Sequence, residues 1–262
     1  MGRFIGSTVG GLYAAVFRPS RLVSTPGRQQ SETLVEKSQR AVHLLLVYLV
    51  NLGLYAGPLT FAGIGIRSES AVPDWFAGLV GTDGPLMIFV AGFVQNSAYL
   101  FGVTVATLFG IHLALLVTFQ SKGFIRTAYS IVYSTSIYLA GLFTVVWYLT
   151  TAEGVRNARD FVVNVQVEFI YRIIELTGSN MRFEIPRPES LVTGNFSLLG
   201  EISLVLLVVL FAYYLYSLYL GTRLNHDAGR FEGVVAVLVV VLLPVLYVVG
   251  SVIAAGLQTI PL

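Results

Sequence analysis

One long stretch without a charged side chain constrains this sequence more than any other feature. From Pro85 to Gln120 the chain has no Asp, Glu, Lys or Arg. As a single helix, Leu86 to Phe119 would be roughly 51 Å long, whereas the hydrocarbon core of a bilayer is about 30 Å thick. We therefore expect a break at Gln95-Asn96-Ser97, with a half-embedded piece over 86–94 followed by a membrane span over 98–119.

The composition of the whole chain also predicts a membrane protein. Of its 262 residues, 55% are hydrophobic and only 11% are charged, whereas a soluble domain carries about 25% charged residues. The charged residues lie in short blocks between long apolar runs. The predicted fold class is all-α, a polytopic transmembrane helical bundle with five spans in the cytoplasmic membrane. The other spans are expected at about 41–66, 127–150, 198–221 and 234–257.

Two segments at the start of the chain have distinct roles in this scheme. Residues 1–40 are predicted to form a basic, amphipathic segment on the cytoplasmic side. In the first span, Gly53 and Gly57 lie four residues apart, which predicts a small-residue face for helix packing. Pro58 is expected to kink the same helix.

The only sizeable polar region, 151–197, is predicted to lie outside the cytoplasm. Apolar residues recur in it at three- and four-residue steps, the pattern of an amphipathic helix, and Gly178 is expected to end that helix. Its apolar side must be buried against the bundle, lipid headgroups or a partner, and the sequence leaves these three alternatives open. The candidate docking residues are Val162, Val165, Phe169 and Ile173.

The distribution of Lys and Arg predicts the orientation. Most of them lie in segments that are cytoplasmic if the N-terminus is cytoplasmic, and long outer loops carry little weight in such a comparison. The C-terminus is then outside. The cationic clusters suit anionic headgroups on the cytoplasmic side and equally suit other membrane proteins. The candidate lipid or partner contacts are Arg18, Arg21, Lys122, Arg126, Arg223, His226 and Arg230.

Three blocks of the sequence together resemble a known family. They are VFRPSRLVSTP, GFIRTAYSIVYSTSIYLAGL and LYSLYLGTRLNHDAGRFEG. This combination is similar to the prokaryotic, in particular archaeal, branch of the Ypt-interacting protein (Yip) family. The matching positions are Arg18 and Pro19; Gly123, Phe124, Arg126, Thr127, Tyr133 and Ser134; and Gly221, Arg223, Leu224 and His226.

The resemblance implies a five-span protein with a cytoplasmic N-terminus and a non-enzymatic role in membrane organisation or trafficking. The chain departs from the family in two places. Leu54-Tyr55-Ala56-Gly57-Pro58 lacks the Asp of the Asp-Leu-Tyr-Gly-Pro motif in eukaryotic members, and the 151–197 insertion is long for the family. The resemblance therefore implies nothing about the role of that insertion.

Ionisable groups for catalysis are sparse in the predicted spans. Charged side chains inside a membrane are candidates for function, and none lies in the middle of a span here. His43, His112 and His226 fall near the cytoplasmic face, where helix capping or headgroup contact is a simpler interpretation than a metal site. The chain has no cysteine, and its net charge of +2 does not indicate nucleic acid.

We therefore expect no catalytic residue, cofactor or metal, and a Yip-like protein that organises lipids or protein partners through its cytoplasmic face. Two alternatives stay open. The first is a structural subunit of a larger membrane complex that docks through the 151–178 helix. The second is a channel or transporter component for small solutes or ions, in which Asn51, Gln95 and Asn96 would line a polar path.

Overall fold

The computed structural model describes residues 34–66, 68–80, 84–149, 152–179, 181, 183–191 and 197–258, and this part of the chain is all-helical, as predicted. A short 3-10 turn lies at Glu69–Ala71. The α-helices are α3 (Leu34–Phe61), α4 (Asp74–Val80), α5 (Pro85–Val117), α6 (Phe124–Leu149), α7 (Ala152–Thr177), α8 (Leu198–His226) and α9 (Arg230–Gln258). The predicted segment 1–40 lies largely outside the described residues, and so do Arg18 and Arg21.

Four of these helices are long and apolar enough to cross a membrane. The stretches are Ser38–Phe61, Pro85–Val117, Leu198–His226 and Arg230–Ile253. A helix of that length spans a hydrocarbon core of about 30 Å. The membrane-embedded class predicted from the composition is therefore confirmed. The bundle also contains α6, whose 26 residues lie beside α8 and α3.

The break expected at Gln95-Asn96-Ser97 is wrong, because α5 runs without interruption from Pro85 to Val117. Asn96 is only 3% exposed. Its amide nitrogen donates to the Thr60 hydroxyl and to the Ile64 carbonyl, each at 3.0 Å. The Asn96 side chain thus forms hydrogen bonds with the end of α3 and with the turn that follows it. Because its amide is satisfied inside the protein, α5 can stay helical at this position.

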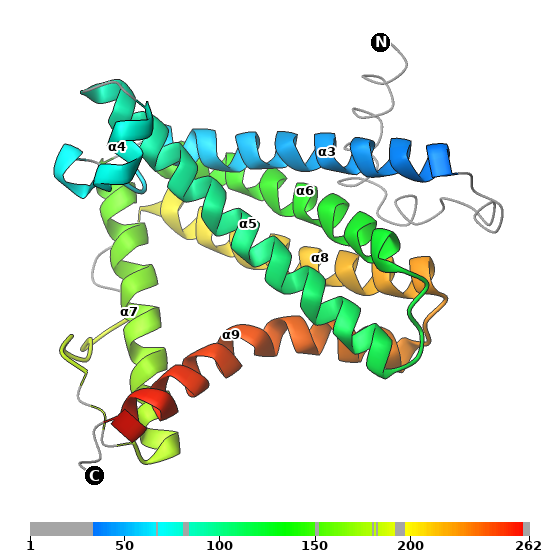
Figure 1. Ribbon diagram of the computed structural model, residues 1–262. Coiled ribbons are helices and arrows are strands. Elements are labelled where there is room, and N and C mark those ends of the chain that lie inside the picture. The colour runs from blue at the N-terminus through cyan, green and yellow to red at the C-terminus, as the bar shows by residue number, and fades with distance from the viewer. Residues whose placement is uncertain are drawn as a thin grey trace.

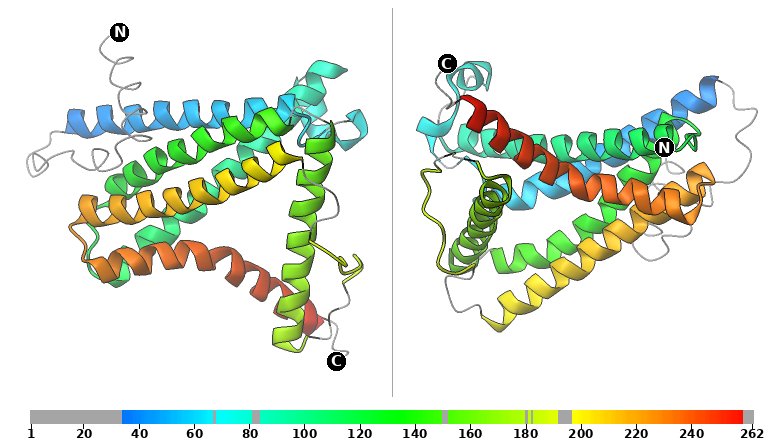
Figure 2. Two further views of the ribbon diagram at one scale, coloured as in Figure 1. Left: turned by 180° about the vertical axis from the view of Figure 1, so that it is seen from behind. Right: turned by 90° about the horizontal axis from the view of Figure 1, so that it is seen from below.

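The two hairpin connections of the bundle lie at one end, and α7 lies at the other (Figure 1). The α5–α6 connection and the α8–α9 connection sit beside each other, next to the start of α3. At the opposite end α7 crosses the bundle at a steep angle. From their shared connection α8 and α9 diverge toward α7 (Figure 2). As predicted, α7 ends just before Gly178, which has a φ of 61°.

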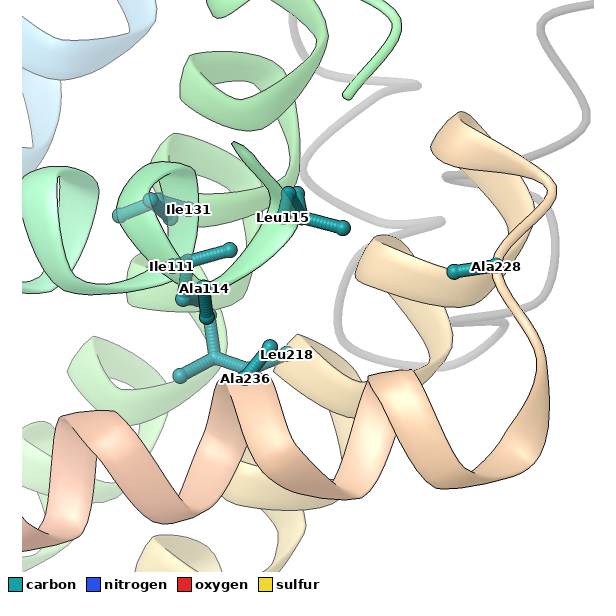
Figure 3. Close-up of a cluster of buried hydrophobic side chains, with 7 residues drawn as sticks. All are labelled: Ile111, Ala114, Leu115, Ile131, Leu218, Ala228 and Ala236. Carbon is teal, nitrogen blue, oxygen red and sulfur yellow. The ribbon is translucent and has the colours of Figure 1, made fainter. Parts of the chain in front are cut away.

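The largest apolar core lies near the connections and joins four helices. Figure 3 shows α5 contributing three side chains to it, while α6, α8, α9 and the α8–α9 connection contribute one each. The members are Ile111, Ala114, Leu115, Ile131, Leu218, Ala228 and Ala236. Close to this core, a Cβ added at Gly221 of α8 would lie 2.8 Å from the Ser130 Cβ of α6. At Gly221, therefore, α8 approaches α6 closely, and Gly110 of α5 makes a comparable approach to α9, where an added Cβ would lie 2.7 Å from Leu243 Cδ1.

Gly53 and Gly57 do not make such an approach within the described chain. A Cβ added at either residue would meet no atom within 4 Å. The prediction that these two glycines pack one helix of the bundle against another is therefore not supported, since α3 presents them away from its neighbours. Pro58 lies inside α3 as expected.

Polar side chains inside the bundle are used to join helices. Asn51 of α3 is fully buried and donates to the Val132 carbonyl of α6 at 2.9 Å. The Ser136 hydroxyl donates to the Asn51 side-chain oxygen at 3.1 Å. Ser134 of α6 and Ser217 of α8 share a hydrogen bond of 2.8 Å. Such bonds contribute about 1 kcal/mol or less each to helix association in membranes.

Candidate interaction site at the two hairpin connections

Three polar contacts hold the two hairpin connections together. We call residues 118–123 and 227–229 the paired connections. The Lys122 backbone N–H donates to His226 Nδ1 at 3.0 Å, and the Lys122 ammonium forms an ion pair with Asp227. Arg126 Nη1 donates to the Asn225 carbonyl at 3.0 Å. Residues about 100 positions apart in the chain are thereby fixed to one another, and all of them except Lys122 belong to two of the sequence blocks that carry the family resemblance.

A buried chain of hydrogen bonds continues from this contact into the bundle. His226 is 0% exposed, and its Nδ1 must lack a proton because it accepts from the Lys122 backbone. The ring proton is therefore on Nε2, which donates to Thr127 Oγ1 at 3.2 Å. The Thr127 hydroxyl then donates to His112 Nδ1, also at 3.2 Å. We call His112, Thr127 and His226 the imidazole chain; it joins α5, α6 and α8.

Both helices that lead into the paired connections end on a left-handed residue that is not glycine. Phe119 follows α5 with a φ of 56°, and Asp227 follows α8 with a φ of 52°. The Gln120 N–H donates to the Leu115 carbonyl at 2.9 Å, the closing bond of a Schellman motif. At Asp227 the conformation places the carboxylate against Lys122. At Phe119 the side chain is 94% exposed and gains no such contact.

Around the paired connections the surface combines cations with large apolar side chains. Phe124 is 47% exposed and Phe231 is 73% exposed. Arg230 is exposed at the start of α9. Arg223 lies along α8, where its Nη1 donates to the Tyr219 hydroxyl at 3.2 Å and its guanidinium stands 5.4 Å from the centre of that ring. Apolar rings beside cations are typical of a surface at the level of lipid headgroups.

The structure therefore brings three of the predicted contacts, Lys122, Arg126 and His226, into one site, with Arg223 and Arg230 on the helices that flank it. The sequence analysis did not identify Thr127 and Asp227 as members. A signal for Asp227 was present, since Asn and Asp are the residues other than glycine that enter the left-handed region most readily. Nothing in the sequence pairs Thr127 with two imidazoles.

The candidate docking face on α7 is partly covered by the chain itself. Ile173 is 6% exposed, Phe169 is partly buried and Val165 is 39% exposed, while the side chain of Val162 lies outside the description. α7 contacts α6 and α9. Packing against its own bundle, one of the three alternatives open at the sequence level, thus accounts for much of the apolar side.

The segment after α7 folds back along that helix through one arginine. Arg187 donates from Nε and Nη2 to the two oxygens of Glu168 at 2.7 and 2.6 Å, and from Nη1 to Glu175 at 2.6 Å. The Tyr171 hydroxyl donates to the Ile185 carbonyl at 2.8 Å. The hydrogen bond from Arg187 lowers the pKa of Glu168 to about 2, and the same contact raises the pKa of Arg187. We call these contacts the Arg187 clasp.

No group of three or more His, Cys, Asp or Glu side chains that suits a metal ion occurs in the described part of the chain. Of the three histidines, His112 and His226 belong to the imidazole chain. The His43 ring shares a hydrogen bond of 2.9 Å with the Tyr133 hydroxyl instead.

No family model, no curated protein and no solved structure matches this chain.

Proposed function

We propose that this chain is a five-span integral membrane protein of the cytoplasmic membrane, with a cytoplasmic N-terminus, that organises lipids or protein partners through the paired connections. In this topology α6 crosses the membrane as the third of the five spans, in addition to α3, α5, α8 and α9, and α7 lies on the outer face. The 26 residues of α6 correspond to about 39 Å of helix, which is sufficient to cross. An odd number of spans places the two termini on opposite sides.

The charge at the two ends of the bundle supports this orientation. Arg40, Lys122, Arg126, Arg223 and Arg230 lie at the end that holds the paired connections, where α3 also begins. The short connections at this end weigh more in the positive-inside rule than the long region between α6 and α8. The end with the paired connections is thus the cytoplasmic one in our proposal.

One observation carries the functional part of the proposal. The paired connections are held by buried and partly buried polar contacts, and the surface formed by them and the adjoining helix ends exposes aromatic rings and cations. A rigid support of this kind positions a binding surface at low entropic cost, because the loops need not become ordered when a partner binds. The resemblance to Yip proteins supports the same type of role.

The topology is tested by cysteine labelling, since the natural chain has no cysteine. Single-cysteine variants Ser38→Cys, Ser70→Cys and Gln166→Cys place a thiol at exposed positions before the first span, after it and on α7. A membrane-impermeant maleimide applied to intact cells should label residues 70 and 166, and residue 38 only after lysis. Labelling of residue 166 from the cytoplasmic side alone would overturn the proposed topology.

The function is tested by identifying what co-purifies with the tagged protein from its native membrane in a mild detergent. Proteins or anionic lipids held by the paired connections should be lost on the Arg230→Glu and Phe231→Ser substitutions. They should be retained on Leu176→Ser, which changes a residue of α7 that is 81% exposed. Retention in the first two variants and loss in the third would contradict our proposal and support docking through α7.

A further inference from the structure

Phe119 combines two unfavourable features that no contact in the described chain offsets. Its φ of 56° is in the left-handed region, where a residue with a Cβ is disfavoured by roughly 1 kcal/mol relative to glycine. Its ring is also 94% exposed. Strained backbone conformations and exposed apolar side chains concentrate at sites that bind something other than the chain itself. The position therefore calls for an environment that accepts an apolar ring.

We propose that Phe119 is an interfacial anchor, whose ring inserts between the lipid headgroups and the acyl chains of the leaflet at the end of α5. The proposal rests on α5 being a membrane span, which is one part of the proposed function, and it does not depend on which leaflet is the cytoplasmic one or on any protein partner.

The position of Phe119 along the bundle indicates that its ring contacts lipid. It follows α5, a helix without a charged residue, by two residues. Phe119 is therefore located at the boundary between the uncharged span and the first charged residues that follow it, Lys122 and Arg126. Arg223 and Arg230 lie at the same end, on the two helices joined by the neighbouring connection. Phe beside Lys and Arg is typical of segments that insert apolar side chains at the boundary between headgroups and acyl chains.

The cations beside the ring complement the phosphates of the headgroups. Lys122 retains 41% of its side-chain exposure while it pairs with Asp227, so its ammonium remains accessible from the solvent side. Phe124, the first residue of α6, exposes a second ring on the same connection. Apolar insertion and phosphate contact thus come from residues within one short segment, which the contact between Lys122 and His226 fixes to the bundle.

The chain's lack of cysteine allows a direct measurement of depth. Single nitroxide labels are placed at Phe119→Cys, Ser121→Cys, Leu113→Cys and Ser70→Cys, and the full chain is reconstituted into nanodiscs of phosphatidylcholine and phosphatidylglycerol. Electron paramagnetic resonance then compares collisions with oxygen, which enters the bilayer, and with a water-soluble nickel chelate. Leu113 is the deep reference, since it lies on α5 and is 60% exposed, and Ser70 is the aqueous reference.

We expect the label at residue 119 to lie below the phosphate level, shallower than residue 113, while the label at residue 121 two positions later stays in water. An accessibility to nickel at residue 119 equal to that at residues 70 and 121 would overturn the anchor. Aqueous accessibility at residue 113 as well would instead show that α5 is not a span, and would therefore count against the proposed function itself.

A second variant tests whether the phenyl ring itself is required for anchoring. Phe119→Gly removes both the ring and the strain, so in detergent it should raise the free energy of unfolding by up to about 1 kcal/mol. In nanodiscs the anchor is lost, and a label at residue 121 should become more mobile than in the otherwise unsubstituted single-cysteine protein. Unchanged mobility of that label would contradict the proposal.

Discussion

At the scale of single residues, His226 has the least freedom to change. Its two ring nitrogens serve opposite roles, one accepting from the Lys122 backbone and the other donating to Thr127, inside a site with no solvent access. A substitution that removes the ring leaves the Lys122 backbone N–H and the buried Thr127 hydroxyl without this partner, and a buried group left unsatisfied costs about 1–3 kcal/mol.

His226→Ala should therefore lower the free energy of unfolding in detergent by about 2–4 kcal/mol, from the lost hydrogen bonds together with the cavity left by the ring. His226→Gln should retain much of the stability, because its amide can accept and donate in similar directions. Asp227→Asn is the matched control. It weakens a solvent-exposed ion pair and should cost less than about 1 kcal/mol. Equal losses in the alanine and asparagine variants would refute the role assigned to the imidazole.

At the scale of elements, the Arg187 clasp holds the segment after α7 by charge. Glu168 has its pKa lowered from 4.5 to about 2, so it binds fewer protons in the folded state than in the unfolded state. The stabilising effect of the pair is therefore fully present above the unfolded pKa and is lost as the pH falls from about 4.5 toward 2. Since the pair is exposed, salt should weaken it as well.

We expect residues 183–190 to lose protection from amide hydrogen exchange below pH 4.5, after correction for the intrinsic effect of pH on exchange. Glu168→Gln should produce the same loss at pH 7. Arg172→Gln is the control, because Arg172 bonds Glu168 and Glu175 from within α7 and has no bond to residues 183–191 of the returning segment. Protection that is unchanged in Glu168→Gln would mean that Tyr171 and Ile185 hold the segment without the charges.

The uncharged run of α5 shows where prediction of elements from the sequence stops. Its apolar character and its length identified a membrane helix, and the amphipathic period of α7 identified that helix and its end at Gly178. The prediction of a break at Asn96 was wrong, because a local sequence pattern does not show which distant residues form hydrogen bonds with a polar side chain. The Thr60 hydroxyl and the Ile64 carbonyl satisfy the amide from a different part of the chain. The spacing of glycines likewise does not identify the face that meets a neighbour, and within the described chain a Cβ added at Gly53 would meet no atom within 4 Å.

At the scale of the whole molecule, the sequence predicted a helical membrane protein and several cations of the site, but not how the site is assembled. Lys122 was selected by its charge, and Arg126 by its charge and by the family resemblance. Their contacts with His226 and Asn225 depend on the α5–α6 and α8–α9 hairpins reaching the same end of the bundle. That meeting follows from the packing of α6 between α3 and α8, which no single segment encodes.

The position of α7 has a mechanical consequence for the bundle. α8 and α9 are joined at the paired connections and diverge from there. α7 lies across the end of the bundle at which they are furthest apart (Figures 1 and 2). This helix of 26 residues, about 39 Å long, contacts both α6 and α9. α7 therefore bridges α6 and α9 at the end of the bundle where the helices diverge, and it supplies there the lateral contact that the paired connections supply at the other end.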